Sequence, residues 1–246
     1  KYATNATETW VTRTLDTSGD VGFFTSMATD SSGNVHISYF DWSNRTLKYA
    51  TNVKGAWVAT TVDDLYYTGT ELFTSIAVDS GGKVHISYFD ATNTALKYAT
   101  NTTGTWVKTT LDNSRYMGAY NSIGVDNGGK VHISYYDLDN GALKYVTNAT
   151  GDWIKTIVDN SGDTGSYTSL ALDNAGKVHV SYFDATNYAL KYATNATGAW
   201  VKTTVDNSGK VGTHTSIGVD SNGKIHISYL HDLNLKYATN ARGDWK

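Results

Sequence analysis

Aromatic and carboxylate side chains recur at matching positions along the chain. Such pairs suit polyhydroxylated ligands, because an aromatic face stacks on a sugar ring while carboxylate oxygens accept hydrogen bonds from hydroxyl groups. If each of five hairpins turns through two residues, strand register places the two kinds of side chain opposite each other at the hairpin's open end. The predicted pairs are Phe24 with Asp41, Phe73 with Asp90, Tyr120 with Asp137, and Tyr167 with Asp184. These pairs are expected to surround the mouth of one central channel.

The fifth hairpin carries a different pair, His214 opposite His231, with Asp232 beside it. This cluster has groups that suit a divalent metal or acid–base chemistry. Glycosidase chemistry needs two carboxylates in distinct environments. The chain has only two Glu residues, Glu8 and Glu71, and its loop Asp residues repeat from unit to unit. We therefore expect the fifth pair to bind ligand with the others, and we expect no catalytic residue, no metal and no cofactor.

The repeated Asp residues also have a simpler interpretation. An Asp at the start of a loop commonly caps the turn by accepting hydrogen bonds from nearby backbone N–H groups. The two roles are compatible, and the Asn three residues later, such as Asn93, would add a donor to a binding site. Repetition favours binding, because several weak sites gain avidity against a multivalent target such as a glycan-coated surface.

Departures from the repeat point to a second group of candidates in the loops. Trp42 stands where other units carry Ala or Leu, and two connections between units contain Tyr66, Tyr67 and Tyr116 in place of the usual Ser-Gly. Aromatic side chains in loops have no role in a core, so we predict a binding patch there, with neutral drift or local packing as the alternative.

Composition limits the class of protein. The chain has 246 residues, no Cys and no Pro, a net charge of −3 and a pI near 6.1. The absence of Cys excludes disulfide scaffolds and thiolate metal sites. Lys and Arg are dispersed, so no footprint for nucleic acid is visible, and no apolar run approaches the length of a membrane span.

Internal repetition organises the whole chain as a single domain, residues 1–246. The motif Lys-Tyr-Ala/Val-Thr-Asn begins at residues 1, 48, 97, 144, 191 and 236, and a Trp follows each of these Lys residues by nine positions. Each unit contains four short segments with the alternation of β-strands, separated by Gly and Asn turns. Four strands repeating every 45 to 49 residues predict an all-β fold, the β-propeller, here with five four-stranded antiparallel blades.

The two ends of the chain are expected to share one blade. We predict that residues 8–16 form the outer strand of the blade that begins near Thr215, which leaves no sheet edge unpaired. Residues 1–5 and 236–240 then compete for one strand position. An added edge strand, self-association through the terminal strands, or excision from a longer array would each accommodate the extra strand.

Two further repeated residues are expected to be structural. The strand His, at positions 36, 85, 132, 179 and 226, is flanked by Val or Ile. We predict a hydrogen-bonded packing position between blades for this His, in preference to a metal ligand. The repeated Trp and the Tyr of Lys-Tyr-Ala-Thr-Asn are likewise predicted to pack between blades, in preference to forming sugar platforms.

Residues 79–90, Asp-Ser-Gly-Gly-Lys-Val-His-Ile-Ser-Tyr-Phe-Asp, and their four relatives resemble hairpins in the propeller repeats of large extracellular bacterial and archaeal proteins. The five-fold count and the period near 47 residues are similar to those of tachylectin-type lectin propellers. The resemblance implies a non-enzymatic, lectin-like module for cell adhesion, located outside the cell or on its surface, with glycans or a glycosylated surface as partner. Two alternatives remain: a structural repeat unit of a longer surface array or filament, and a propeller glycosidase.

Overall fold

The computed structural model describes residues 1–66 and 73–246, and the regular elements of this part of the chain are all β-strands. Two residues of the sequence analysis, Tyr67 and Glu71, lie outside the described residues. The strands are β1 (Tyr2–Thr4), β2 (Val11–Arg13), β3 (Val21–Thr29), β4 (Val35–Asp41), β5 (Thr46–Lys54), β6 (Ala56–Asp64), β7 (Thr74–Val78), β8 (Val84–Asp90), β9 (Ala95–Thr100), β10 (Val107–Asp112), β11 (Met117–Val125), β12 (Val131–Asp137), β13 (Ala142–Thr147), β14 (Ile154–Asp159), β15 (Thr164–Leu172), β16 (Val178–Asp184), β17 (Ala189–Thr194), β18 (Val201–Asp206), β19 (Val211–Val219), β20 (Ile225–His231) and β21 (Asn234–Thr239).

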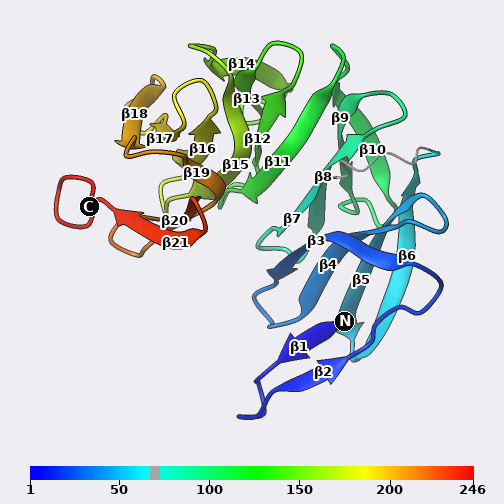
Figure 1. Ribbon diagram of the computed structural model, residues 1–246. Helices are drawn as coiled ribbons and strands as arrows, with labels where there is room; N and C mark the ends of the chain where they lie inside the picture. Colours follow the sequence, from blue (N-terminus) through cyan, green and yellow to red (C-terminus); the bar gives the residue numbers. More distant parts are fainter. Residues whose placement is uncertain (67–72) are drawn as a thin grey trace.

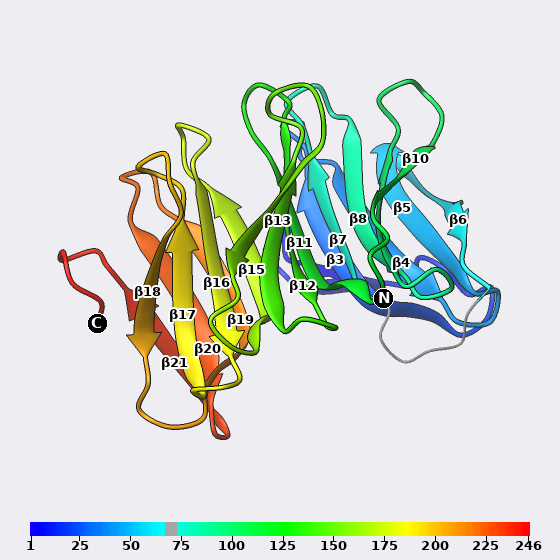
Figure 2. The ribbon, with the colours of Figure 1, turned by 90° about the horizontal axis from the view of Figure 1, so that it is seen from above.

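The strands form antiparallel sheets in chain order. Four sheets have four strands each, β3 to β6, β7 to β10, β11 to β14 and β15 to β18, which confirms the predicted repeat unit. The last sheet has three strands, β19 to β21, and the first has two, β1 and β2. The sheets follow one another around an arc (Figure 1), and the view turned by 90° shows them standing side by side (Figure 2). The strands β3, β7, β11, β15 and β19 contact one another in succession, and we call them the inner strands.

The hairpin turns differ from the prediction by one residue. In the first four-stranded sheet, Asp30 N–H donates to Asn34 O and Gly33 N–H donates to Asp30 O, both at 3.0 Å, so the loop has three residues. Gly33 has a φ of 78°, as a three-residue loop with a left-handed last residue requires. The Asp30 side chain accepts from the N–H of Ser32 and Asn34, which stabilises this turn. The other four hairpins repeat the arrangement.

The predicted pairing of aromatic and carboxylate residues is therefore wrong. The register of β3 and β4 shifts twice near the open end, so Asp41 lies opposite Val21 and not opposite Phe24. The same shifts pair Met117 with Asp137 and Thr164 with Asp184. In the last sheet His231 lies opposite Val211, so it does not pair with His214.

The hydrophobic core lies between consecutive sheets. Leu143 and Tyr145 of one sheet, for example, pack against Val178, Val180 and Tyr182 of the next. At each junction the repeated Tyr contacts the Trp of the following unit, with ring centroids 5.1 to 5.3 Å apart. The five contacts are Tyr2–Trp57, Tyr49–Trp106, Tyr98–Trp153, Tyr145–Trp200 and Tyr192–Trp245. The packing role predicted for these Tyr and Trp residues is confirmed.

The repeated His is also a packing residue. His85 is buried, its Nδ1 lies 2.6 Å from the Tyr98 hydroxyl, and its Nε2 lies 3.4 Å from Asp79. A carboxylate beside Nε2 favours the proton on that nitrogen, so Nδ1 accepts from the hydroxyl. Burial lowers the pKa of His85, and Asp79 opposes this shift only in part. The hydrogen bond between the repeated His and Tyr recurs in the other units, although His226 of the last sheet is only half-buried.

The terminal strands do not pair with each other in the described structure, which corrects the predicted closure. β2 pairs with β1, β21 pairs with β20, and the two ends of the arc lie apart (Figure 1). β1 and β21 have the same sequence, Tyr-Ala-Thr, at the positions that pair, so β2 could form hydrogen bonds with either strand. β1 is only a short loop away from β2, and closing a short loop costs less entropy than joining the chain ends.

Candidate functional site

Five aromatic side chains form a continuous series along the inner strands. The ring centroids are 5.8 Å apart for the first pair and 4.4 to 4.5 Å apart for the remaining three. We call this series the aromatic arc, and it consists of Phe24, Phe73, Tyr120, Tyr167 and His214. Its members are all residues that the sequence analysis selected, although they meet one another and not the predicted carboxylates.

The backbone of the aromatic arc is unusual for residues with side chains. Phe24, Tyr120, Tyr167 and His214 have φ between 49° and 54°, in the left-handed region. Bulky residues rarely adopt this conformation, which costs about 1 kcal/mol or more at each position. The register shifts of the inner hairpins produce it, because they place extra residues on the inner strand. Non-glycine residues held in this region cluster at functional sites.

The aromatic arc is partly open to solvent. Phe24 is 37% exposed, His214 is exposed, and Phe73, Tyr120 and Tyr167 are half-buried. Each residue of the aromatic arc therefore keeps part of its surface in contact with solvent while it contacts its neighbours. Chemically, such a surface offers apolar faces for stacking, together with phenol and imidazole groups for hydrogen bonds.

The four loop carboxylates lie beneath the loops. Asp90, for example, is 2% exposed, accepts from the Asn93 side-chain amide at 2.8 Å, and lies 3.4 Å from Lys97 Nζ. Asp41, Asp137 and Asp184 are equally buried and contact the equivalent Asn and Lys. The turn-capping interpretation of these residues is confirmed.

Sequence reasoning missed a repeated ion-pair network at the sheet junctions. Asp112, at the end of an outer strand, accepts from the Tyr135 hydroxyl at 2.8 Å and lies 3.3 to 3.4 Å from Lys144 and Lys155 of the next unit. Burial alone would raise the pKa of Asp112, but the hydrogen bonds from Ser114 and Tyr135 and the charges of the two lysines hold it at about 2. The signal was present, because an Asp follows the repeated Trp by six positions in five units.

The His and Asp of the last sheet do not gather into one cluster. His214 contacts Tyr167, with ring centroids 4.5 Å apart, whereas His231 Nε2 lies 3.6 Å from Asp232. Asp232 is 66% exposed. Within residues 1–66 and 73–246, no group of three or more His, Asp or Glu side chains is arranged to hold a metal ion.

The predicted loop patch is divided in the structure. Trp42 packs against the core and contacts Phe23, with centroids 5.6 Å apart. Tyr66 is 76% exposed, and Tyr116 is 38% exposed with the Arg115 guanidinium 5.2 Å from its ring centroid. Tyr67 lies outside the described residues, so its place in this patch stays a prediction.

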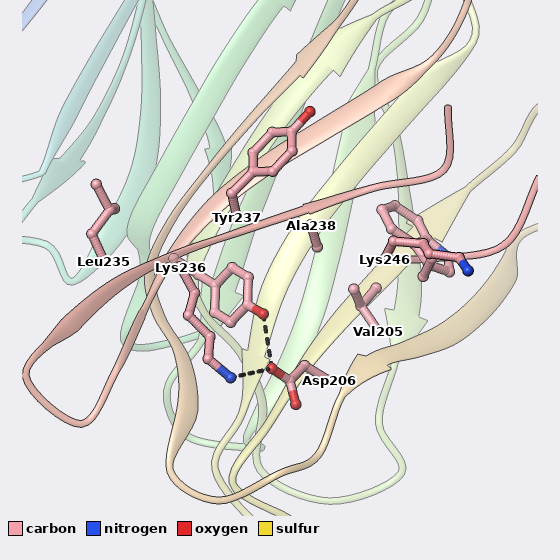
Figure 3. Close-up of a pocket in the computed structure, with 9 residues that line it drawn as sticks. Val205, Asp206, Leu235, Lys236, Tyr237, Ala238 and Lys246 are labelled. Atoms are coloured by element: carbon pink, nitrogen blue, oxygen red, sulfur yellow. Dashed lines mark hydrogen bonds and ion pairs between the residues drawn. The ribbon is translucent and has the colours of Figure 1, made fainter. Parts of the chain in front are cut away.

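A groove beside β21 is a different kind of surface. It is lined by Leu235, Lys236, Tyr237 and Ala238 of β21 together with Asp206 of the preceding sheet, and β21 is the edge strand of a sheet that has three strands. Figure 3 shows Lys236 reaching Asp206 on one side of β21 and Tyr237 on the other. The groove therefore marks an open sheet edge.

Comparison with known proteins supports the fold. No family model matches the chain, and no curated protein is similar to it. A triple arginine-to-alanine mutant of AofleA from Arthrobotrys oligospora is 16% identical over 96% of this chain and 75% of its own, with a TM-score of 0.66. A mutant of the Aleuria aurantia lectin in complex with Fucα1-6GlcNAc is 12% identical over 90% of this chain and 76% of its own, with a TM-score of 0.65.

An enzyme has the same architecture. A polysaccharide lyase, the ulvan lyase of family PL25, is 14% identical over 89% of this chain and 69% of its own, with a TM-score of 0.64. Together with the repeated four-stranded sheets, these similarities assign the chain to the β-propeller fold class. In the described part of the chain, no helix has the length and apolar character to cross a membrane.

Proposed function

We propose that this chain is a non-enzymatic carbohydrate-binding module whose site is the aromatic arc. The observation that carries the proposal is the row of partly exposed aromatic side chains on left-handed backbone, a conformation that bulky residues rarely adopt. The rings would stack on the apolar faces of sugar units, and the hydroxyl groups of Tyr120 and Tyr167 would bind sugar hydroxyls. Propellers that are lectins or that act on polysaccharides share the fold, which agrees with a sugar ligand.

The non-enzymatic part of the proposal rests on the carboxylates. Hydrolysis of a glycosidic bond uses an acid whose pKa is raised beside a carboxylate whose pKa is low. In the described residues, every Asp with a resolved shift has a lowered pKa. The buried ones are held by Lys and Tyr, as Asp112 is. Release of new reducing or unsaturated ends from a panel of polysaccharides would overturn this part.

The setting we propose is extracellular or at a cell surface, with five blades counted by their inner hairpins. A glycosylated surface offers many copies of one ligand, and a repeated arc of similar aromatic positions suits such a target because weak contacts add through avidity.

The test compares two tyrosines with the same backbone conformation. Tyr120 lies in the aromatic arc with a φ of 49°, and Tyr188 lies in a loop with a φ of 53° and is 49% exposed. Asn tolerates left-handed φ, so Tyr120→Asn and Tyr188→Asn should both fold. On a glycan array followed by calorimetry, we expect Tyr120→Asn to weaken binding about tenfold or more, as for loss of a central aromatic contact, and Tyr188→Asn to bind like wild type.

Two results would contradict the proposed site. Equal binding by wild type and both variants would place the sugar elsewhere on the molecule. No binding by wild type to any glycan would remove the carbohydrate ligand itself and favour the structural alternative, a unit of a larger array. This alternative is supported by the exposed apolar residues of the terminal sheets, such as Trp10 and Leu235.

A further inference from the structure

One aromatic pair is missing from the regular series of sheet junctions. The repeat contains six Tyr and six Trp residues of the junction type, and five Tyr–Trp contacts are made. In the described structure, the two residues without a contact of this type are Trp10, directly before β2, and Tyr237, in β21. Trp10 is 74% exposed and Tyr237 is 57% exposed. The Tyr residues of the interior junctions, by contrast, are 5 to 8% exposed.

Trp10 and Tyr237 are of the two residue types that contact each other at every junction between sheets. In each contact the Tyr of one unit meets the Trp of the next unit, as Tyr145 meets Trp200 at 5.1 Å. In the described structure, Tyr237 of the last sheet contacts no Trp, and Trp10 beside the first sheet contacts no Tyr of the repeated motif. Each end of the arc therefore carries the half of a junction that the other end lacks.

The exposed Tyr237 is already oriented for this contact. Its hydroxyl lies 2.5 Å from His226 Nδ1, and its ring stacks on that of His226 with centroids 6.0 Å apart. The interior pairs have the same geometry, for example His132 and Tyr145 at 2.5 Å and 6.0 Å. Because the rotamer is held in advance, docking an indole on Tyr237 costs little additional side-chain entropy.

The outward face of the first hairpin is equally available. The inward side of β1 and β2 is occupied, since Tyr2 contacts Trp57 at 5.1 Å. The residues of β2 are all exposed, and the hairpin has the register of the third and fourth strands elsewhere, with Tyr2 opposite Arg13 as Tyr145 is opposite Thr156. The hairpin is therefore built like the third and fourth strands of the complete sheets. In those sheets the equivalent Trp contacts a Tyr of the preceding unit.

We propose that the chain associates head to tail, with Trp10 of a second copy docking on Tyr237. Within one chain, β2, which follows Trp10, and β21, which contains Tyr237, lie at opposite ends of the arc (Figure 1), and both residues are exposed. Strand exchange would have to break the β1–β2 pairing and remove Tyr2 from Trp57, whereas stacking of Trp10 on Tyr237 breaks no existing contact. This proposal is independent of sugar binding.

Such an interface is heterologous, because it joins different surfaces of the two copies, so a dimer still has one unused surface of each kind. Each added copy leaves one free Tyr237 and one free Trp10, so the assembly grows as a filament or closes into a ring of several copies. One aromatic contact at an exposed site also implies weak, concentration-dependent association. The occupant is a second copy of this chain, and the recognised feature is its N-terminal hairpin.

Sedimentation velocity over a concentration series tests the proposal with Trp10→Ser, Tyr237→Ser and the control Tyr188→Ser. Wild type and Tyr188→Ser should increase in mass with concentration. Trp10→Ser and Tyr237→Ser should each stay monomeric, because each lacks one half of the contact, with association weakened about tenfold or more. Near-ultraviolet circular dichroism checks that each variant is folded.

A mixing experiment separates head-to-tail docking from other modes. Trp10→Ser retains Tyr237, and Tyr237→Ser retains Trp10, so an equimolar mixture should form a heterodimer that stops at two copies. A symmetric Tyr237 contact would instead let Trp10→Ser associate alone. The proposal is overturned by a mixture that stays monomeric, by single variants that associate like wild type, or by a wild type that is monomeric at every concentration, as closure within one chain would make it.

Discussion

The interior sheets and the terminal sheets place the same residues in different surroundings. Leu143 and Tyr145 in the interior are 0% and 5% exposed, whereas their equivalents in the last sheet, Leu235 and Tyr237, are 83% and 57% exposed. All four residues lie in strands that form the same kind of hairpin. The comparison shows that strand formation is local, whereas burial depends on the fourth strand and on the sheet that follows.

Glycines show the same contrast on the inner strands. A Cβ atom at Gly165 would lie 2.7 Å from Leu143 Cα of the preceding sheet. At Gly22, the equivalent position in β3, a Cβ atom would meet nothing within 4 Å. Both residues have a positive φ, so the backbone conformation favours glycine at both positions. Only at Gly165 would a side chain also collide with the preceding sheet.

The largest expected effect is loss of a buried leucine. Leu143→Ala should lower the free energy of unfolding by about 3 kcal/mol, because it removes fully buried methyl groups and leaves a cavity. Leu235→Ala should change it by less than about 0.5 kcal/mol, since that side chain is already in water. Urea denaturation of both variants measures the difference. Equal losses would mean that the last sheet is covered in solution, by a second copy or by ring closure.

The next effect concerns the ion-pair network. Asp112 is 1% exposed and Asp206 is 15% exposed, although both accept from a Tyr hydroxyl at 2.8 Å. Asp112→Asn should cost about 2 kcal/mol, because it removes a buried charge that pairs with Lys144 and Lys155, and Asp206→Asn should cost about 1 kcal/mol. Thermal denaturation at constant pH compares them. A larger loss for Asp206→Asn would contradict the burial of the interior network.

The smallest expected effect is the pH dependence of stability. Burial lowers the pKa of His85, His132 and His179, with their Asp partners opposing the shift in part. Below about pH 6.5 the unfolded chain therefore binds more protons than the folded chain. The free energy of unfolding should decrease as the pH falls from 6.5 toward the lower pKa values of the folded state.

The variant His132→Gln tests whether the buried histidines of the interior sheets cause this pH dependence. His132→Gln should flatten the decrease, because it removes one of the three titrating groups. Urea denaturation at a series of pH values above 5 measures it, in a range where the low pKa of the interior Asp residues keeps them charged. An unchanged slope in His132→Gln would assign the decrease to other groups.

Much of the fold could be predicted from the sequence, and less of the site. The repeat located the strands and the packing of Trp106 and His85, because alternation and recurrence are local properties. The predicted turn length was wrong by one residue, since Asp30 and Gly33 stabilise a three-residue loop where a two-residue turn was expected. That shift, with the two irregularities that follow it, separated Phe24 from Asp41.

By itself, the sequence determined the repeating unit, its strands and the residue types that pack between sheets. A strand can be recognised from the alternation of apolar and polar side chains over a few consecutive residues. Only the tertiary structure decided which copies of a repeated residue are buried and which face water. Tyr145 lies in a complete sheet that is followed by another sheet, whereas Tyr237 lies in the three-stranded last sheet. It also assembled the aromatic arc, because irregular register and contacts between units separated by more than forty residues carry no local signal.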